Sequence, residues 1–305
     1  MAVGPQPGPS EFDRPGLGLT LMLGFCLLAP ASDAFSKTLA EDIPVLELVF
    51  ARFVIQASVL LPIVYVTSRQ FRVSRLGLQL IGLRTALHVA GIYLMVTGLT
   101  YLPLADAIAI AFVMPFILLL MGHFLLGEVV GRRRLVACAV GFGGTLMVMQ
   151  PSFAEVGWPV LYPLAVAFVF AGFILVTRRV AHEVDPVTMQ GVSGVMAVLG
   201  LGLMYLLLPR EGLFALEPIG PSWPLWLMMG LTGTVAHLLM SWSLRYAATS
   251  TVAPMQYIEI PVAALIGLVA FGDCPNIMAL GGITITMGTG LYILWHESTD
   301  REALP

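Results

Sequence analysis

Long apolar runs recur through the whole chain and restrict its fold more than any other feature. Each run is about 20 residues long, the length that an α-helix needs to cross the hydrocarbon core of a bilayer. The chain of 305 residues is 58% hydrophobic and only 11% charged, whereas soluble domains carry about 25% charged residues. We therefore predict an all-α integral membrane protein with ten transmembrane helices. The predicted spans are 17–38, 45–67, 76–99, 104–126, 133–150, 158–179, 187–208, 223–246, 251–272 and 276–295.

Turn signals separate the spans, and the connections are mostly too short for a soluble domain. Proline marks the breaks near residues 44, 103, 151, 186, 209 and 275. Residues 1–16 are polar and rich in proline and glycine, which predicts a disordered tail. They lack the basic start of a signal peptide, so we expect the first apolar run to stay as an anchor. Residues 296–305 form a second predicted tail.

Basic residues predict how the chain lies in the membrane, because cytoplasmic loops carry an excess of lysine and arginine. Only Lys37 and Arg210 fall on one side of the predicted spans, and eleven arginines fall on the other. Both termini of this multi-pass protein are therefore predicted to face the cytoplasm, in a bacterial inner membrane. The eleven are Arg14, Arg69, Arg72, Arg75, Arg132, Arg133, Arg134, Arg178, Arg179, Arg245 and Arg301.

The second half of the chain repeats landmarks of the first half at a constant spacing of 145 residues. Each half holds five spans, an odd number, so the two copies must cross the membrane in opposite senses. This predicts inverted five-helix repeats at 17–150 and 158–295, an architecture of alternating-access carriers with a binding site near the midplane. The recurring pairs are Tyr101 and Tyr246, Gly127 and Gly272, Glu128 and Asp273, Ala137 and Gly282, Gly141 and Thr286, and Thr145 and Gly290, with Pro115 and Pro261 one residue out of step.

Short motifs are spread over nearly the full length, from about Gly18 to His296. They include Arg52 within residues 50–53, residues 101–107, the glycine-rich residues 141–144, and counterparts in the second half. With these motifs the chain resembles the ten-helix EamA type of the drug/metabolite transporter superfamily. The resemblance implies a central cavity lined mainly by spans one, three, four, six, eight and nine, with spans five and ten outside it. It leaves the substrate open, since the family carries amino acids, vitamins, nucleotide-linked compounds and drugs.

Ionisable side chains inside the spans form a layer near the membrane centre. A charge at that depth costs about 2.5–3.5 kcal/mol on insertion scales, so it normally faces protein or a wet cavity. Arg84 and His88 lie one helical turn apart on one face, and His237 and Glu259 lie at a similar depth. We expect Arg84 and Glu259 to form the polar part of the cavity, with Arg84 holding a substrate anion and Glu259 a cation or a proton. A permanent Arg84–Glu259 ion pair that fastens two helices is the structural alternative.

A second layer of charges lies nearer the outer ends of the spans. Asp33 and Lys37 have the i,i+4 spacing of a local salt bridge. The alternative is an outer gate in which Arg52 competes with Lys37 for Asp33. Three carboxylates precede or begin spans, where the positive end of the helix dipole favours them; these are Asp106, Glu128 and Asp273.

Further polar and aromatic residues could line a cavity for an organic solute. His88 by itself fits a hydrogen-bonded packing histidine better than a ligand contact, and Ser241 lies one turn beyond His237 on the same face. The remaining candidates for substrate binding are Tyr93, Phe112, Trp242, Gln256 and Tyr257.

The predicted function is secondary active transport of a small organic metabolite by alternating access, as export or exchange. A cavity with charges of both signs suits an amino-acid-like zwitterion or a carboxylate. The alternative is a proton-coupled drug efflux carrier of broad range, against which the fixed cation of Arg84 argues. Substrate identity, the coupling ion, and the choice between a monomer and a homodimer stay open.

Other functional classes have little support in the sequence. The five histidines show no zinc-binding pattern and the loops are short, so we predict no enzyme, no metal and no cofactor. The three cysteines show no pairable or metal-type spacing. A net charge of −3 without a basic arm excludes nucleic acid as a predicted partner. The predicted partners are the lipid bilayer and a small solute, with protons as an open second solute.

Overall fold

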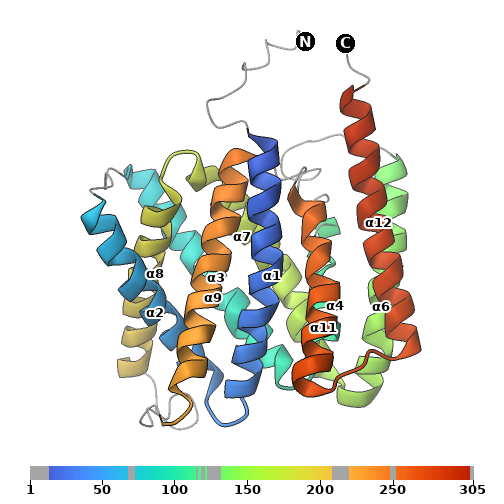
Figure 1. The fold of residues 1–305 in the computed structure, drawn as a ribbon, viewed down its shortest axis with the longest axis horizontal. Helices are drawn as coiled ribbons and strands as arrows, with labels where there is room; N and C mark the ends of the chain where they lie inside the picture. The colour runs from blue at the N-terminus through green and yellow to red at the C-terminus, as the bar shows by residue number, and fades with distance from the viewer. Residues whose placement is uncertain are drawn as a thin grey trace.

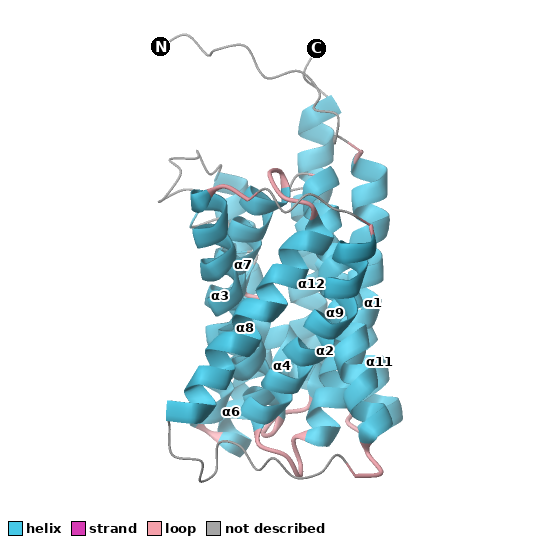
Figure 2. Cartoon of the chain, turned by 90° about the vertical axis from the view of Figure 1, so that its left-hand side faces the viewer, coloured by secondary structure: helices cyan, strands magenta, loops and turns pink. Residues whose placement is uncertain are grey.

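The computed structural model describes residues 14–67, 73–114, 116–117, 121, 132–207, 220–247 and 252–302. Within these ranges the chain forms ten α-helices and two short 3-10 helices, with no strand (Figures 1 and 2). Six helices are long and apolar enough to cross a membrane, and two shorter apolar helices accompany them. The predicted fold class of an all-α membrane protein is confirmed. The α-helices are α1 (Pro15–Leu39), α2 (Val45–Val66), α3 (Arg75–Leu99), α4 (Leu104–Ala111), α6 (Arg132–Val156), α7 (Leu161–Ala181), α8 (Pro186–Leu207), α9 (Trp223–Tyr246), α11 (Glu259–Phe271) and α12 (Ile277–Glu302); the 3-10 helices are Trp158–Val160 and Ala253–Ile258.

Most helix ends lie within two residues of the predicted spans, because proline or a polar turn stands at them. Pro44 and Pro103 directly precede α2 and α4, and Pro186 begins α8. The predicted break at residues 150–151 is wrong, since α6 continues to Val156. The helix ends instead before Gly157, whose φ of 73° favours glycine. Neighbouring groups in membrane helices compensate for the backbone hydrogen bond that proline removes.

Helices from the two halves of the chain pack against each other in pairs. α1 packs against α9, α2 against α8, α3 against α7, α4 against α11, and α6 against α12. Small residues permit the close approach, as where Gly194 of α8 meets the backbone of Ala57 in α2. Large apolar side chains such as Val66 and Val269 remain exposed on the outside, as expected for a surface covered by lipid.

The two ends of the bundle are used below as reference points. α1 begins and α12 ends at the same end (Figure 1), which we call the terminal end. The opposite end, where α1 ends and α4 begins, is the far end. α6 and α12 lie together at one edge of the bundle (Figure 1), away from the helices that surround its centre.

Candidate functional site

A pocket lies between the helices of the two halves. It is lined by α1, α2, α3, α4, α7, α9, α11 and the 3-10 helix Ala253–Ile258. These include every span that the sequence resemblance assigned to a central cavity; α2 joins them through one residue, Arg52. α6 and α12 contribute nothing to this lining, as the resemblance also implied. The lining residues are Phe25, Ala29, Asp33, Arg52, Gly91, Ile92, Met95, Ile108, Ala111, Phe112, Met114, Val166, Phe170, His237, Gln256 and Glu259.

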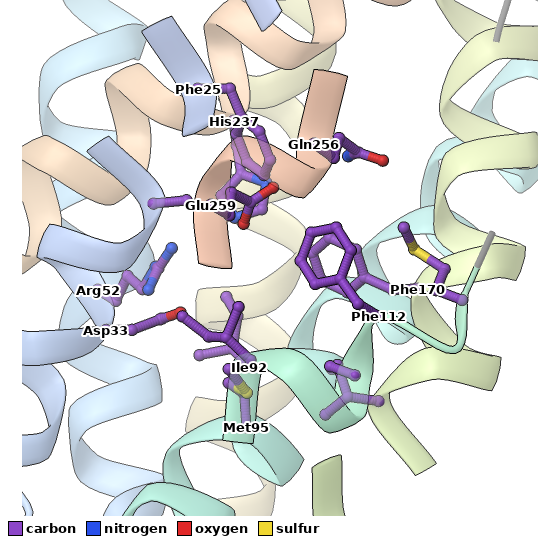
Figure 3. A pocket seen from close by; sticks show the side chains of 16 residues that line it. Phe25, Asp33, Arg52, Ile92, Met95, Phe112, Phe170, His237, Gln256 and Glu259 are labelled. Carbon is purple, nitrogen blue, oxygen red and sulfur yellow. The ribbon is translucent and has the colours of Figure 1, made fainter. Parts of the chain in front are cut away.

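One wall of the pocket carries its charges. Arg52 and Asp33 lie close together on one side (Figure 3) and interact electrostatically. Glu259 lies nearby, within electrostatic range of Asp33, and His237 is next to it in the same view (Figure 3). Arg52 is only 4% exposed, and its Nη1 atom has no hydrogen-bond partner among the described residues. The pocket thus offers two carboxylates and one guanidinium to a solute.

The opposite wall is aromatic and apolar. Phe112 and Phe170 lie across the pocket from Arg52 (Figure 3). Two more apolar residues line the pocket elsewhere: Phe25 lies beside His237, with ring centroids 5.6 Å apart, and Met95 lies near Ile92 (Figure 3). The sequence predicted Phe112 but missed the other three. Nothing in the sequence separates these residues from other apolar residues in a membrane helix, so no signal could have identified them.

The predicted pairing of Arg84 with Glu259 is wrong. Arg84 is fully buried and does not line the pocket. Its Nε donates to the Thr177 hydroxyl at 2.9 Å, its Nη1 donates to the Ser193 hydroxyl at 2.9 Å, and its guanidinium lies over the Phe173 ring. Arg84 therefore joins α3 to α7 and α8, and Arg52 is the arginine that shares the pocket with Glu259. Counting residues along the span could not give the direction in which the Arg84 side chain points.

His88 and His237 lie in one aromatic cluster beside the pocket. Their ring centroids are 4.2 Å apart, and His88 also stacks on Phe173 at 4.7 Å and meets Phe53 edge-on at 5.2 Å. Only His237 reaches the pocket lining. His88 thus packs beside the pocket, but neither ring nitrogen has a hydrogen-bond partner in the described part of the chain, so it is not the hydrogen-bonded packing histidine that its sequence context favoured.

The other predicted binding residues divide clearly. Gln256 lines the pocket, whereas Ser241 belongs to a buried hydrogen-bond chain: Gln56 donates to Gln190, Gln190 to the Ser241 hydroxyl, and Ser241 to the His237 carbonyl. Three further predicted residues do not line the pocket either. Tyr257 packs behind it with its ring 5.2 Å from Phe112, Tyr93 is exposed on the outside of the bundle, and Trp242 is half-buried.

The predicted local salt bridge between Asp33 and Lys37 is also wrong. Lys37 Nζ donates to Asp273 at 3.1 Å and to the Leu102 carbonyl at 3.0 Å, and it lies 4.9 Å from the centre of the Phe271 ring. Lys37 therefore connects the end of α1 to two turns at the far end of the bundle. Asp33 instead turns inward toward the pocket. A partner 236 positions away in the chain displaced the partner one helical turn away.

The remaining predicted carboxylates lie near helix ends. Asp106 is in the first turn of α4, as expected, and accepts a hydrogen bond from the Ser152 hydroxyl at 3.2 Å. Asp273 precedes α12 and also holds Lys37. Glu128, Gly127 and Pro115 lie outside the described residues, as do Arg69, Arg72 and Arg210.

Comparisons with known proteins agree with this architecture. The model of the EamA-like transporter family matches residues 16–150 and again residues 157–295. A riboflavin transporter of Rhizobium johnstonii is 29% identical over 73% of this chain and 72% of its own length. An S-adenosylmethionine uptake transporter of Rickettsia felis is 25% identical over 88% of each chain. A solved crystal structure that covers 91% of this chain and 95% of its own shares the fold, with a TM-score of 0.64 at 18% identity. The protein is a multi-pass membrane transporter rather than an enzyme, and it belongs to the EamA-like transporter family.

Proposed function

We propose that this protein is a secondary transporter that moves a small zwitterionic metabolite through the central pocket by alternating access. The observation that carries the proposal is the pocket between the two halves that Asp33, Arg52 and Glu259 line together. Ionisable residues inside transmembrane segments are rare, usually face the bundle interior or a water-filled cavity, and mark solute or ion pathways.

Opposite charges in the pocket favour a solute that carries both signs. Arg52 offers a planar donor group to a carboxylate, and Glu259 faces the space with no hydrogen-bond or ion-pair partner among the described residues. Phe112 and Phe170 offer a surface for an apolar or aromatic body between the two charges. A solute that carries a carboxylate and no positive group would be repelled by the two carboxylates of the pocket. We therefore favour a zwitterion over a simple carboxylate as the solute.

The helix pairs support two inverted repeats that move against each other. If the second half repeats the first, α7 corresponds to α1 and α9 to α3. The contact of α1 with α9 is then the counterpart of the contact of α3 with α7. The pairs α2 with α8, α4 with α11, and α6 with α12 each join an element to its own counterpart. A two-fold axis that relates the two repeats would produce this pattern of contacts.

The direction of transport is also part of what we propose. The two relatives described above are named for riboflavin and for uptake of S-adenosylmethionine, whereas export or exchange was expected from the sequence. Alternating access is reversible, so one pocket serves both directions and the solute gradients set the net flux. We propose exchange, in which external solute accelerates release of internal solute.

Transport into liposomes tests the proposal. Purified protein is reconstituted and offered labelled S-adenosylmethionine, riboflavin and a set of α-amino acids, with empty liposomes as the background. We expect saturable flux of at least one zwitterion, and a loss of about tenfold or more in Glu259→Gln because a buried charged contact is removed. The control is Glu183→Gln, which removes a carboxylate from an exposed pair with Arg179 and should retain flux. Flux that is equal in both variants, or absent for every zwitterion, contradicts the proposal.

Broad-range efflux of lipophilic cations, driven by protons, is the second candidate. It is favoured by the acidic and aromatic lining, in which Asp33 and Glu259 outnumber the one guanidinium. Thermal-shift measurements separate the candidates. Stabilisation by lipophilic cations alone, with flux that follows an imposed pH gradient, supports efflux, whereas stabilisation by zwitterions supports metabolite transport.

A further inference from the structure

We infer that Gly233 of α9 is a positioning residue that holds the Arg52 guanidinium in place for a carboxylate of the solute. The inference rests on the proposed function and adds the feature that gives the pocket its preference for a carboxylate. Gly233 does not line the pocket and acts through Arg52.

The guanidinium of Arg52 lies directly on the backbone of α9 at Gly233. An ideal Cβ atom built on Gly233 would lie 2.6 Å from both Cζ and Nη2 of Arg52 and 2.8 Å from Nε. Real Cβ atoms do not approach other atoms so closely. Glycine weakens a helix interior relative to alanine, so its presence in the middle of α9 needs a reason, and the room taken by the guanidinium supplies one.

This contact determines which part of Arg52 remains for a solute. Nε and Nη2 abut Gly233, and Nη1 is buried without a hydrogen-bond partner among the described residues. A guanidinium binds carboxylates through fixed donor directions, so its orientation matters more than its charge alone. The space beside Gly233 fixes the orientation of the Arg52 guanidinium. A guanidinium held in this way selects a solute with a carboxylate over one with a neutral or cationic group in its place.

Alanine at position 233 should displace the guanidinium and leave the fold intact. The atoms that crowd the new Cβ belong to the far end of a flexible side chain, so Arg52 can move while both helices stay in place. Gly230, one turn earlier on α9, behaves differently. A Cβ there would lie 2.7 Å from the Cβ of Ile55, and the three atoms nearest to it all belong to Ile55, so the crowding falls on Ile55 and not directly on the Arg52 guanidinium.

Binding of matched acids and amines tests the inference. Purified protein is titrated with L-phenylalanine against 2-phenylethylamine, L-tyrosine against tyramine, L-histidine against histamine, and L-methionine against 3-(methylthio)propylamine. Each pair differs by the carboxylate. We expect wild-type protein to bind the acid of at least one pair about tenfold or more tightly than the amine, because the carboxylate gains charge-assisted hydrogen bonds. In Gly233→Ala and Arg52→Gln this preference should fall close to one.

Two glycine variants and a rescue separate positioning from general disturbance. Gly200→Ala, where a Cβ meets nothing within 4 Å, should keep the preference, and Gly230→Ala should keep it with a lowered melting temperature. The double variant Gly233→Ala/Arg52→Lys should regain part of the preference for the acid. The compact lysine ammonium, unlike the planar guanidinium, does not require the space beside Gly233.

Several outcomes overturn the inference. They are no preference for the acid in any pair with wild-type protein, an unchanged preference in Gly233→Ala, an equal loss in Gly230→Ala, or a Gly233→Ala protein that does not fold. Failure of the proposed function looks different, since wild-type protein would then move no zwitterion into liposomes.

Discussion

Arg84 is a buried cation whose described hydrogen-bond partners are two hydroxyl groups rather than a carboxylate. Such an arrangement is costly in a membrane, where a guanidinium without an anion keeps its full charge. Thr177 and Ser193 offset part of that cost, and the face of Phe173 adds a cation–π contact. Because the two hydroxyls belong to α7 and α8, the charge of Arg84 fastens three helices near the terminal end.

Removing one of these hydroxyls should destabilise the protein measurably. In Thr177→Val the Arg84 Nε loses its partner in a fully buried site, so we expect the free energy of unfolding to fall by about 1–2 kcal/mol. Unfolding in detergent, followed by tryptophan fluorescence, measures the change. Thr284→Val is the control, because that hydroxyl is exposed and bonds only to a carbonyl of its own helix; its effect should stay within about 0.5 kcal/mol. Equal effects in the two variants would contradict this account of Arg84.

His182, which lies outside the membrane-spanning segments, makes the stability of the protein depend on pH. Burial lowers the pKa of its imidazole, and the nearby charges of Arg178, Arg245 and Arg179 lower it further. The unfolded chain therefore binds a proton at this site at a higher pH than the folded chain, so stability falls as the pH drops through about 6.5. We expect the melting temperature to decrease between pH 7.5 and pH 5.5, and to decrease less in His182→Gln. Equal decreases in the two proteins would show that His182 does not contribute.

The direction in which a side chain points within the bundle could not be predicted from the sequence. Counting along the spans assigned Glu259 to another layer than Asp33 and Arg52, yet these three residues line one pocket. The partners of Arg84 and Lys37 depended on how each helix is rotated and on which helix lies beside it. Those partners result from packing between segments more than 90 positions apart in the chain. The local i,i+4 spacing of Asp33 and Lys37 carries no information about that packing.

At the level of helices, α6 and α12 form a pair that supports the fold without lining the pocket. Their contact depends on two glycines that face each other. A Cβ on Gly144 would lie 2.9 Å from the carbonyl oxygen of Gly282, and a Cβ on Gly282 would meet the carbonyl of Gly144 even more closely. With backbone this close to backbone, no side chain can move aside to make room.

Gly282→Ala should therefore weaken the protein and leave its solute selectivity unchanged. We expect the free energy of unfolding to fall by about 1–3 kcal/mol, as overpacking of a close helix contact usually costs. Gly288→Ala on the same helix is the matched control, since a Cβ there meets nothing within 4 Å. Affinities for the acid and amine pairs should match those of wild-type protein in both variants. A stable Gly282→Ala protein, or one with altered selectivity, would contradict this role of the pair.

Helix ends were easier to predict than helix partners, because proline and polar turns act locally. Pro44, Pro103 and Pro186 stand at the ends where the sequence placed them. Pro151 was misleading because a proline inside a membrane helix does not have to end it. The true end of α6, before Gly157, depends on a positive φ that the sequence permitted but did not require.

Across the whole molecule, polar contacts between the two halves lie toward both ends of the pocket. Toward the terminal end, Arg84 and the chain from Gln56 through Gln190 to Ser241 are fully or almost fully buried. At the far end, Lys37 binds Asp273, and the two side chains are 17% and 28% exposed. A carrier that opens to each side in turn must break one set of contacts at a time. The partly hydrated far-end contact should separate more easily than the buried one, since exposed ion pairs contribute little.

Lys37→Met should consequently favour the conformation that is open at the far end. The reporter is Met95→Cys in the pocket lining, introduced after Cys26, Cys138 and Cys274 have been replaced by serine. A membrane-impermeant maleimide should react with this cysteine about two- to fivefold faster when Lys37 is replaced, as expected from the loss of an ion pair worth up to about 1 kcal/mol. Arg179→Met removes an exposed pair with Glu183 at the terminal end and should leave the rate unchanged. An unchanged or slower reaction in Lys37→Met would mean that the far end is held shut by the apolar packing of α1 against α11 and not by the ion pair.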